Sequence, residues 1–201
     1  MPYWGVNLRT GVTRGSVMNP AEIGTLMLEF GALSKITDRP IYYEKAKRGI
    51  VALYERRSEI GLVGTTIDVE TGEWIDTDSH ITGRIDSYYE YLLKAWLLFE
   101  DDDFRRMWES SIAAANTYLP EERATGYWYG HVDMQTGERT ATRFGALDAF
   151  MPAVLALGGI PLRLVSQAGS RRNITFVIRD ADVPAAMNQL HREFFGAVAS
   201  A

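Results

Sequence analysis

Apolar residues recur at helical spacing in four segments of the first 120 residues. The first begins at residues 19–22, Asn-Pro-Ala-Glu, where a capping asparagine, a proline at the first helical position and an early acid are typical of a helix N-terminus. Apolar residues at 23, 26, 30 and 33 continue the period. Further helices are predicted over about 41–57, 84–99 and 102–119, the last ending before Pro120.

Two short β-hairpins are predicted between these helices, at 67–73 and 132–138. Each has a Thr-Gly turn between alternating strands, and the two segments lie 65 residues apart. The order helix, helix, hairpin therefore repeats, and a further helix is expected to begin near Ala146. Repeated helix pairs bury a common face either as a solenoid or as a closed α/α barrel.

The sequence changes character after Gly158-Gly159. Residues 162–166 and 174–178 are predicted strands, and residues 180–195 an amphipathic helix. Residues 1–159 hold 16 Lys and Arg against 23 Asp and Glu, whereas residues 160–201 hold 5 against 3. All Tyr and Trp residues lie at or before Tyr129. We therefore predict two units, helix pairs over 1–158 and a small β-β-α segment over 159–201.

Composition excludes several classes of function. The chain has no cysteine, so it forms no disulfide, thiolate metal site or cysteine nucleophile. Its net charge of −5 argues against nucleic acid as a partner. We expect no transmembrane segment, because no stretch approaches the roughly 20 apolar residues needed. The N-terminus lacks the features of a signal peptide, so a cytoplasmic location is the default expectation.

The three histidines give no metal-binding pattern. His80, His131 and His191 share no short spacing typical of metal ligands. Each is interpreted as a surface or hydrogen-bonding histidine, and no metal-ligating residue is assigned.

The helix predicted at 84–99 carries one polar stripe on an otherwise apolar surface. Asp86, Glu90 and Lys94 recur every four residues, and Arg84 lies just before them. A buried charge without a partner is costly. Two interpretations stay open. Glu90 and Lys94 form an ion pair on a hydrated edge, or the stripe lines a water-filled cavity that binds a polar ligand.

Acidic residues near the starts of other predicted helices favour the cavity. Glu22 lies in the first helix, and Asp148 stands just before Phe150-Met151-Pro152. Paired carboxylates are the usual apparatus of glycoside hydrolysis, one donating a proton and the other activating water or attacking. Four aromatic residues of the hairpins could stack on sugar rings or pack in the core: Trp74, Tyr127, Trp128 and Tyr129.

Several motifs together resemble glycoside hydrolase family 47, the class I α-1,2-mannosidases. They are Asn7-Leu8-Arg9-Thr10-Gly11, Leu28-Glu29-Phe30, Gly61-Leu62-Val63-Gly64, Asp86-Ser87-Tyr88-Tyr89-Glu90-Tyr91 and Leu147-Asp148-Ala149-Phe150-Met151-Pro152. The match covers about residues 2–158 and is nearest to the ER degradation-enhancing mannosidase-like branch. It implies a mainly α fold, part of an (α/α)7 barrel of helix pairs with short β-hairpins. It also implies hydrolysis of terminal α-1,2-linked mannose in oligosaccharides, with inversion.

The same resemblance implies roles for individual residues. Asp86 matches a catalytic carboxylate, and Glu22, Arg84, Glu90 and Asp148 are expected to bind substrate. Calcium is implied as a cofactor, although the family's C-terminal threonine ligand has no counterpart in this chain. The family's general acid and general base blocks would fall before and after the matched region. We therefore expect the isolated chain to be inactive and to self-associate through exposed helix faces.

The C-terminal unit resembles part of an ACT module of aspartate kinases, on the segments 165–170 and 171–177. Two alternatives to hydrolysis follow. The half barrel binds mannosides without catalysis, or the ACT-type segment senses an amino acid in a regulatory role.

Overall fold

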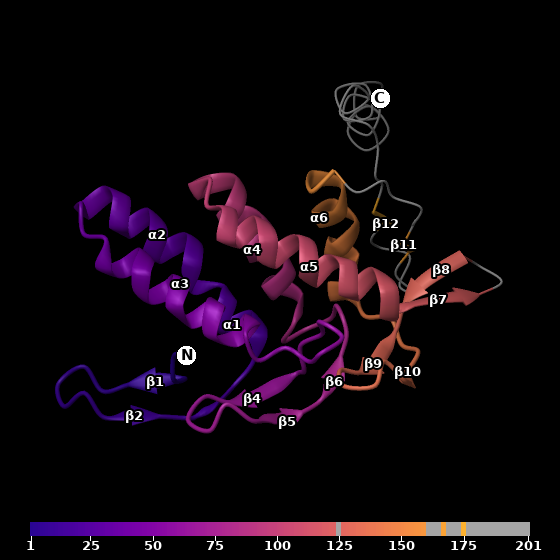
Figure 1. Ribbon diagram of the computed structural model, residues 1–201, viewed down its shortest axis with the longest axis horizontal. Coiled ribbons are helices and arrows are strands. Elements are labelled where there is room, and N and C mark those ends of the chain that lie inside the picture. Colours follow the sequence, from indigo (N-terminus) through magenta and orange to yellow (C-terminus); the bar gives the residue numbers. More distant parts are fainter. Residues whose placement is uncertain (124–125, 160–165, 168–173, 176–201) are drawn as a thin grey trace, which may run out of the picture.

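The computed structural model describes residues 1–123, 126–159, 166–167 and 174–175. Within these residues the helices lie side by side in a row, and most of the short strands follow one side of that row (Figure 1). The mainly helical character predicted from the sequence is confirmed. None of the helices in the described part is long and apolar enough to span a membrane.

The first predicted helix begins where the sequence placed it but is interrupted. It forms α1 (Pro20–Gly24) and α2 (Leu26–Thr37), with Thr25 between them. The Asn19 side chain accepts a hydrogen bond from the Glu22 backbone N–H at 3.0 Å, which confirms the predicted cap. Helix α1 packs closely on α4 at Gly24, since a Cβ built there would lie in van der Waals contact with the Tyr88 Cα, at 3.6 Å.

Two helix pairs share one design. Helix α2 turns back into α3 (Ile41–Tyr54), and α4 (Asp86–Phe99) turns back into α5 (Asp102–Tyr118). Each turn uses a left-handed residue, Asp38 with φ 51° and Glu100 with φ 55°. The boundaries predicted for these last three helices, 41–57, 84–99 and 102–119, were correct to within three residues.

The two predicted hairpins are present and match in detail. The first consists of β4 (Thr66–Asp68) and β5 (Trp74–Asp76), and the second of β9 (His131–Asp133) and β10 (Arg139–Ala141). Asp68 and Asp133 each accept hydrogen bonds from the two backbone N–H groups that follow two and three residues later. Gly72 and Gly137 supply the positive φ angles that these turns require.

Short strands join the hairpins into two three-stranded sheets. β3 (Val17–Met18) pairs with β4, and β6 (Asp78–Ser79) pairs with β9, both antiparallel. Two further pairs lie at the margins: β1 (Gly5–Val6) with β2 (Thr13–Arg14), and β7 (Pro120–Arg123) with β8 (Gly126–Tyr129). One residue, Thr77, separates β5 from β6, so the two sheets are continuous in the chain.

Helix α4 is the centre of the core. Tyr88, Tyr89, Leu92 and Leu93 are each at most 1% exposed, and the Tyr88 hydroxyl lies 3.0 Å from the Ser111 Oγ of α5. The Ala21 N–H donates to the Arg84 carbonyl at 2.8 Å, which ties the start of α1 to the loop that leads into α4. The first turns of α1 and α4 therefore lie side by side.

The helix expected near Ala146 begins as a 3₁₀ turn, η1 (Ala146–Phe150), and continues as α6 (Met151–Leu157). Beyond it, β11 (Ser166–Gln167) pairs antiparallel with β12 (Ile174–Thr175). β12 lies within the strand predicted at 174–178, whereas β11 overlaps the strand predicted at 162–166 only at Ser166. The helix predicted at 180–195 lies outside the described residues.

Candidate functional site

The acids expected at the site come from the first turns of three helices. Glu22 lies in the first turn of α1, Asp86 is the first residue of α4, and Asp148 lies in the first turn of η1. The positive end of a helix dipole favours a negative charge at such positions. Helix α4 contacts η1, and the pKa of Asp148 is raised mainly by burial, with the charge of Asp86 adding to the increase.

Asp86 is half-buried at the start of the central helix. Burial raises its pKa above the usual value for aspartate, and the negative charge of Glu90 one turn later adds to the increase. Hydrogen bonds from Ser87 act in the opposite direction but do not cancel the effect of burial. A carboxyl group with a raised pKa is suited to holding and moving a proton.

Asp148 is only 3% exposed, and its Oδ2 accepts a hydrogen bond from the Gly145 N–H at 2.8 Å. Its Oδ1 has no hydrogen-bond partner in the described part of the chain. Burial raises the pKa of Asp148, against the opposing effects of Gly145, Thr82 and His131. Burial with so few hydrogen bonds makes the ionised form of Asp148 costly and favours the protonated form.

The other three predicted residues are placed differently. Glu22 is exposed and accepts a hydrogen bond from the Asn19 side-chain amide at 2.8 Å. Arg84 is exposed with a left-handed φ of 81°, which directs the loop between β6 and α4. Glu90 pairs with Lys94 at 2.5 Å, and both side chains are partly exposed. The hydrated ion pair therefore accounts for Glu90 and Lys94, and the deeper carboxyl of this group is Asp86.

The aromatic residues divide between packing and the site margin. The Trp74 indole N–H donates to the Arg56 carbonyl at 2.7 Å, and Tyr129 is buried with its hydroxyl bonded to Asn116. The contacts of Trp74 and Tyr129 therefore favour packing in the core over stacking on sugar rings. Trp128 meets Phe144 edge to face at 5.3 Å, beside the cavity that Phe144 lines.

A cavity of about 400 Å³ opens beside the start of α4. Arg84 is the one predicted site residue that lines it. The other lining residues come from β4 to β6, the loop before α4, β9 and the segment before η1: Thr65, Asp76, Asp78, His80, Thr82, Gly83, His131, Arg143, Phe144 and Gly145. Its size falls within the range of small-molecule sites.

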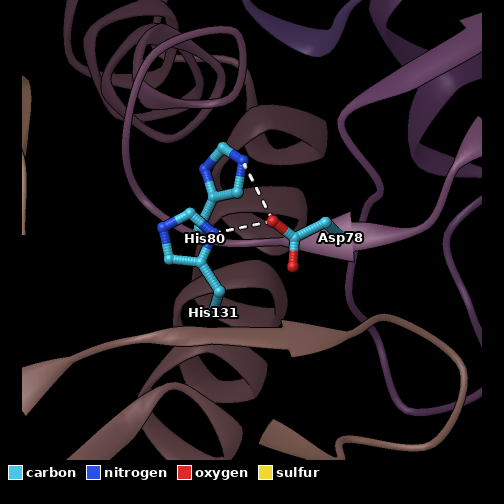
Figure 2. A group of neighbouring side chains, drawn as sticks. All are labelled: Asp78, His80 and His131. Carbon is cyan, nitrogen blue, oxygen red and sulfur yellow. Dashed lines mark hydrogen bonds and ion pairs between the residues drawn. The ribbon is translucent and has the colours of Figure 1, made fainter. Parts of the chain in front are cut away.

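Two histidines and an aspartate meet in the wall of this cavity. The His131 Nδ1 lies 2.7 Å from the Asp78 Oδ2, and the His80 Nε2 lies 4.0 Å from the same oxygen. The two imidazole rings face each other with centroids 4.4 Å apart, beside the Asp78 carboxylate (Figure 2). Both histidines are buried, at 5% and 3% exposure.

Strand register explains why these residues meet. Asp78 pairs with Asp133 and Ser79 with Val132 across β6 and β9, so His80 follows opposite His131. Side chains two residues apart on a strand share a face, which puts Asp78 beside both rings. Burial lowers the pKa of His80 to about 4, with His131 adding to the effect, so this ring is neutral at pH 7.

This cluster was missed from the sequence, because His131 lies 53 residues after Asp78 and no linear motif joins it to Asp78 and His80. The sequence feature that could have revealed the cluster was the repeated hairpin. Asp78-Ser79-His80 and His131-Val132-Asp133 are mirror-related tripeptides beside the repeated hairpins, as an antiparallel pairing requires. The interpretation of His80 and His131 as hydrogen-bonding histidines holds, but not as surface residues. His191 lies outside the described residues.

The raised pKa of Asp148 predicts how stability changes with pH. The folded state holds this proton more tightly than the unfolded state, so Asp148 opposes folding progressively as pH rises from about 3.8 through its folded pKa. Asp148→Asn keeps an acceptor for Gly145 and removes the buried charge. We expect the substitution to raise the free energy of unfolding more at pH 7 than at pH 4, measured by urea unfolding.

Asp133→Asn is the matched control, because hydrogen bonds led by that from Thr77 lower the pKa of Asp133. The ionised Asp133 stabilises the folded state above pH 3.8, and this stabilisation is lost in acid. Asp133→Asn should therefore destabilise the chain at pH 7. Equal destabilisation by both substitutions at pH 7 would contradict the account of Asp148.

Comparison with known proteins identifies the class to which this architecture belongs. The chain belongs to glycosyl hydrolase family 47, whose family model matches residues 1–175. The match extends past residue 158 and covers β11 and β12. The boundary predicted at residue 158, with an ACT-like unit beyond it, stays a prediction.

Individual relatives agree with the family match. Alpha-mannosidase I MNS5 of Arabidopsis thaliana is 36% identical over 97% of this chain and 30% of its own length. ER degradation-enhancing alpha-mannosidase-like protein 2 of Homo sapiens is 38% identical over 79% of this chain and 27% of its own length. The chain thus spans about a third or less of these relatives.

Solved structures share the fold. The alpha-1,2-mannosidase from Trichoderma reesei superposes with a TM-score of 0.64 at 27% identity, over 79% of this chain and 34% of its own. A D-mannose isomerase superposes with a TM-score of 0.52 at 13% identity, over 77% of this chain and 41% of its own, and shows likeness of fold alone.

Proposed function

We propose that the chain contributes part of the catalytic barrel of an α-mannosidase that hydrolyses terminal α-1,2-linked mannose. The observation that carries the proposal is the position of Asp86. Asp86 is the first residue of the central helix and has a raised pKa, and both the buried Asp148 and a cavity lined by Arg84 lie close to this helix start. The helix pairs and hairpins would form part of an (α/α)7 barrel, as the superposition on the fungal mannosidase supports.

Each residue would have a distinct task in this reaction. Asp86 would hold or accept a proton close to the glycosidic bond, since burial raises its pKa and favours the protonated form. Arg84 would donate hydrogen bonds to substrate hydroxyl groups from the cavity wall. Asp148, which is buried and does not line the cavity, would hold a proton, because burial raises its pKa and the charge of Asp86 adds to the increase. Inverting hydrolysis needs a second carboxyl about 6.5–9.5 Å from the first, with water between them.

Calcium, which the family resemblance implies, does not fit the donor cluster described here. Calcium takes about 6–8 oxygen ligands. Asp78, His80 and His131 offer one carboxylate and two imidazoles. We therefore assign no step of the reaction to calcium from these residues. A calcium requirement of the natural full-length protein remains a proposal.

The proposal predicts that the natural full-length protein releases mannose from α-1,2-mannobiose. Mannose should be measured with and without added calcium, and α-1,6-mannobiose serves as the control substrate. Release from the α-1,2 linkage alone is the expected result. Absence of release with calcium present would contradict the proposal.

A non-catalytic role in mannoside binding is the second candidate, supported by the polar cavity beside Arg84. The isolated chain would then bind α-1,2-mannobiose without cleaving it. Calorimetric titration of the chain, compared with Arg84→Ala, tests this. Saturable heat in the wild type and its loss in the variant support binding, whereas no heat from either protein excludes it.

Self-association also remains a proposal, supported by the large apolar side chains on the surface. Leu8, Ile36 and Leu98 are 95%, 83% and 53% exposed. The amino-acid-sensing role of the ACT-like segment rests on the sequence resemblance alone.

A further inference from the structure

We propose that Asp78, His80 and His131 form a binding site for a divalent transition metal ion of the zinc type, open to the cavity beside α4. The site uses none of the residues assigned to mannoside hydrolysis except for sharing the cavity that Arg84 lines. The proposed metal site therefore does not depend on the proposed hydrolytic activity, and the two can be tested separately.

The donor set selects the class of metal. Two imidazole nitrogens and one carboxylate oxygen suit zinc and its neighbours in the first transition row, whereas calcium and magnesium prefer oxygen ligands throughout. The chain has no cysteine to compete as a softer ligand. Three protein ligands would leave a coordination position for water or a ligand hydroxyl from the cavity.

The spacing of the donor atoms is close to what an ion requires. One donor atom from each residue lies within 4.8 Å of the others. Zinc bonds of about 2.0–2.1 Å put tetrahedral ligand atoms roughly 3.3–3.4 Å apart. The observed 2.7 Å from His131 to Asp78 and 4.0 Å from His80 to Asp78 lie on either side of that value. Small side-chain rotations would equalise them.

Neighbouring hydrogen bonds already orient the ligands. The Thr140 hydroxyl donates to the Asp78 Oδ1 at 2.5 Å and leaves Oδ2 directed at the two rings (Figure 2). Outer partners of this kind fix the orientation of metal ligands. The strand pairing of β6 with β9 holds the histidines opposite each other on rigid backbone.

Metal binding would replace two existing contacts. The ion would take the place of the proton between His131 and Asp78. It would also replace the 3.0 Å contact between the His80 Nε2 and the Thr65 Oγ1. The Thr65 hydroxyl still donates its hydrogen bond to the Asp78 carbonyl at 2.6 Å, so it keeps a partner. The change of tautomer at His80 ends the 3.2 Å bond from the Thr82 N–H, the longest in this cluster.

The charges around the cluster are balanced enough to admit a cation. Arg143 lies 3.9 Å from the Asp78 Oδ2 but is 73% exposed, so it can move into solvent. Arg84 is also exposed at the cavity rim. Asp76 lines the same cavity, and the buried Asp148 interacts electrostatically with His131. Asp76 therefore supplies negative charge at the cavity that both arginines line.

The test is a calorimetric titration of the metal-free full chain with Zn²⁺. We expect a single ion per chain, with affinity about tenfold or more weaker in His80→Gln and in His131→Gln. His191→Gln is the matched control and should bind as the wild type does. Excess Ca²⁺ should not compete. Absence of Zn²⁺ binding, or equal binding by all three variants, would overturn the proposal.

A second measurement does not depend on the variants folding. X-ray absorption of the Zn²⁺-loaded wild-type chain should show a nitrogen and oxygen shell with the scattering pattern of two imidazoles. The spectrum of hydrated zinc, or of a single imidazole, would overturn the assignment even if the titration showed uptake.

Discussion

Asp86→Asn in the natural full-length protein should lower kcat for α-1,2-mannobiose by about 100-fold to 10,000-fold. A positioned acid or base contributes a factor of this size, and asparagine keeps the shape of the side chain while removing its proton chemistry. KM should change little, because the substitution removes an interaction specific to the transition state. Steady-state rates with the released mannose as readout provide the measurement.

The control for Asp86→Asn is Asp102→Asn. Asp102 is an exposed acid in the first turn of α5, so the same chemical change is made at another helix N-terminus away from the cavity. Its rates should match the wild type. If Asp86→Asn retained more than about a tenth of wild-type kcat, Asp86 would not be a catalytic carboxyl.

Phe104→Ala should produce a large loss of stability in the helical core. Phe104 is 0% exposed at the start of α5, with the Lys47 ammonium 5.9 Å from the centre of its ring. Removing a buried phenyl ring costs about 3–5 kcal/mol, because the lost burial is compounded by a cavity. That is a large share of the roughly 5–15 kcal/mol available to a typical domain.

Chemical denaturation of the wild type and of Phe104→Ala measures this loss. Leu98→Ala on α4 is the comparison, since Leu98 is 53% exposed and its removal should cost less than about 1 kcal/mol. A loss below about 1 kcal/mol for Phe104→Ala would show that α5 does not pack against the core as described.

Local patterns in the sequence were sufficient for the helix pairs and hairpins. Asn19 and Pro20 marked a helix start, and the Thr-Gly turns marked both hairpins, because caps and turns depend on residues close in sequence. The interruption at Thr25 was not predictable in this way. It accompanies the close packing of Gly24 against Tyr88, which is a tertiary contact.

The candidate site was predictable in part for the same reason. Asp86 and Asp148 could be found from their positions at helix starts and from the family motifs. Their raised pKa values depend on burial, which sequence spacing does not determine. The pairing of His80 with His131 depends on the register of β6 against β9. Strand register between distant segments is set by the whole fold, so the histidine cluster emerged from the structure.

We propose that this chain forms part of the catalytic barrel of an inverting α-1,2-mannosidase. Proton NMR of the natural full-length protein acting on α-1,2-mannobiose tests it most directly, because the anomer released first reports the mechanism. We expect β-mannose to appear first and then to equilibrate with the α anomer. Initial release of α-mannose, or no release with calcium present, would contradict it.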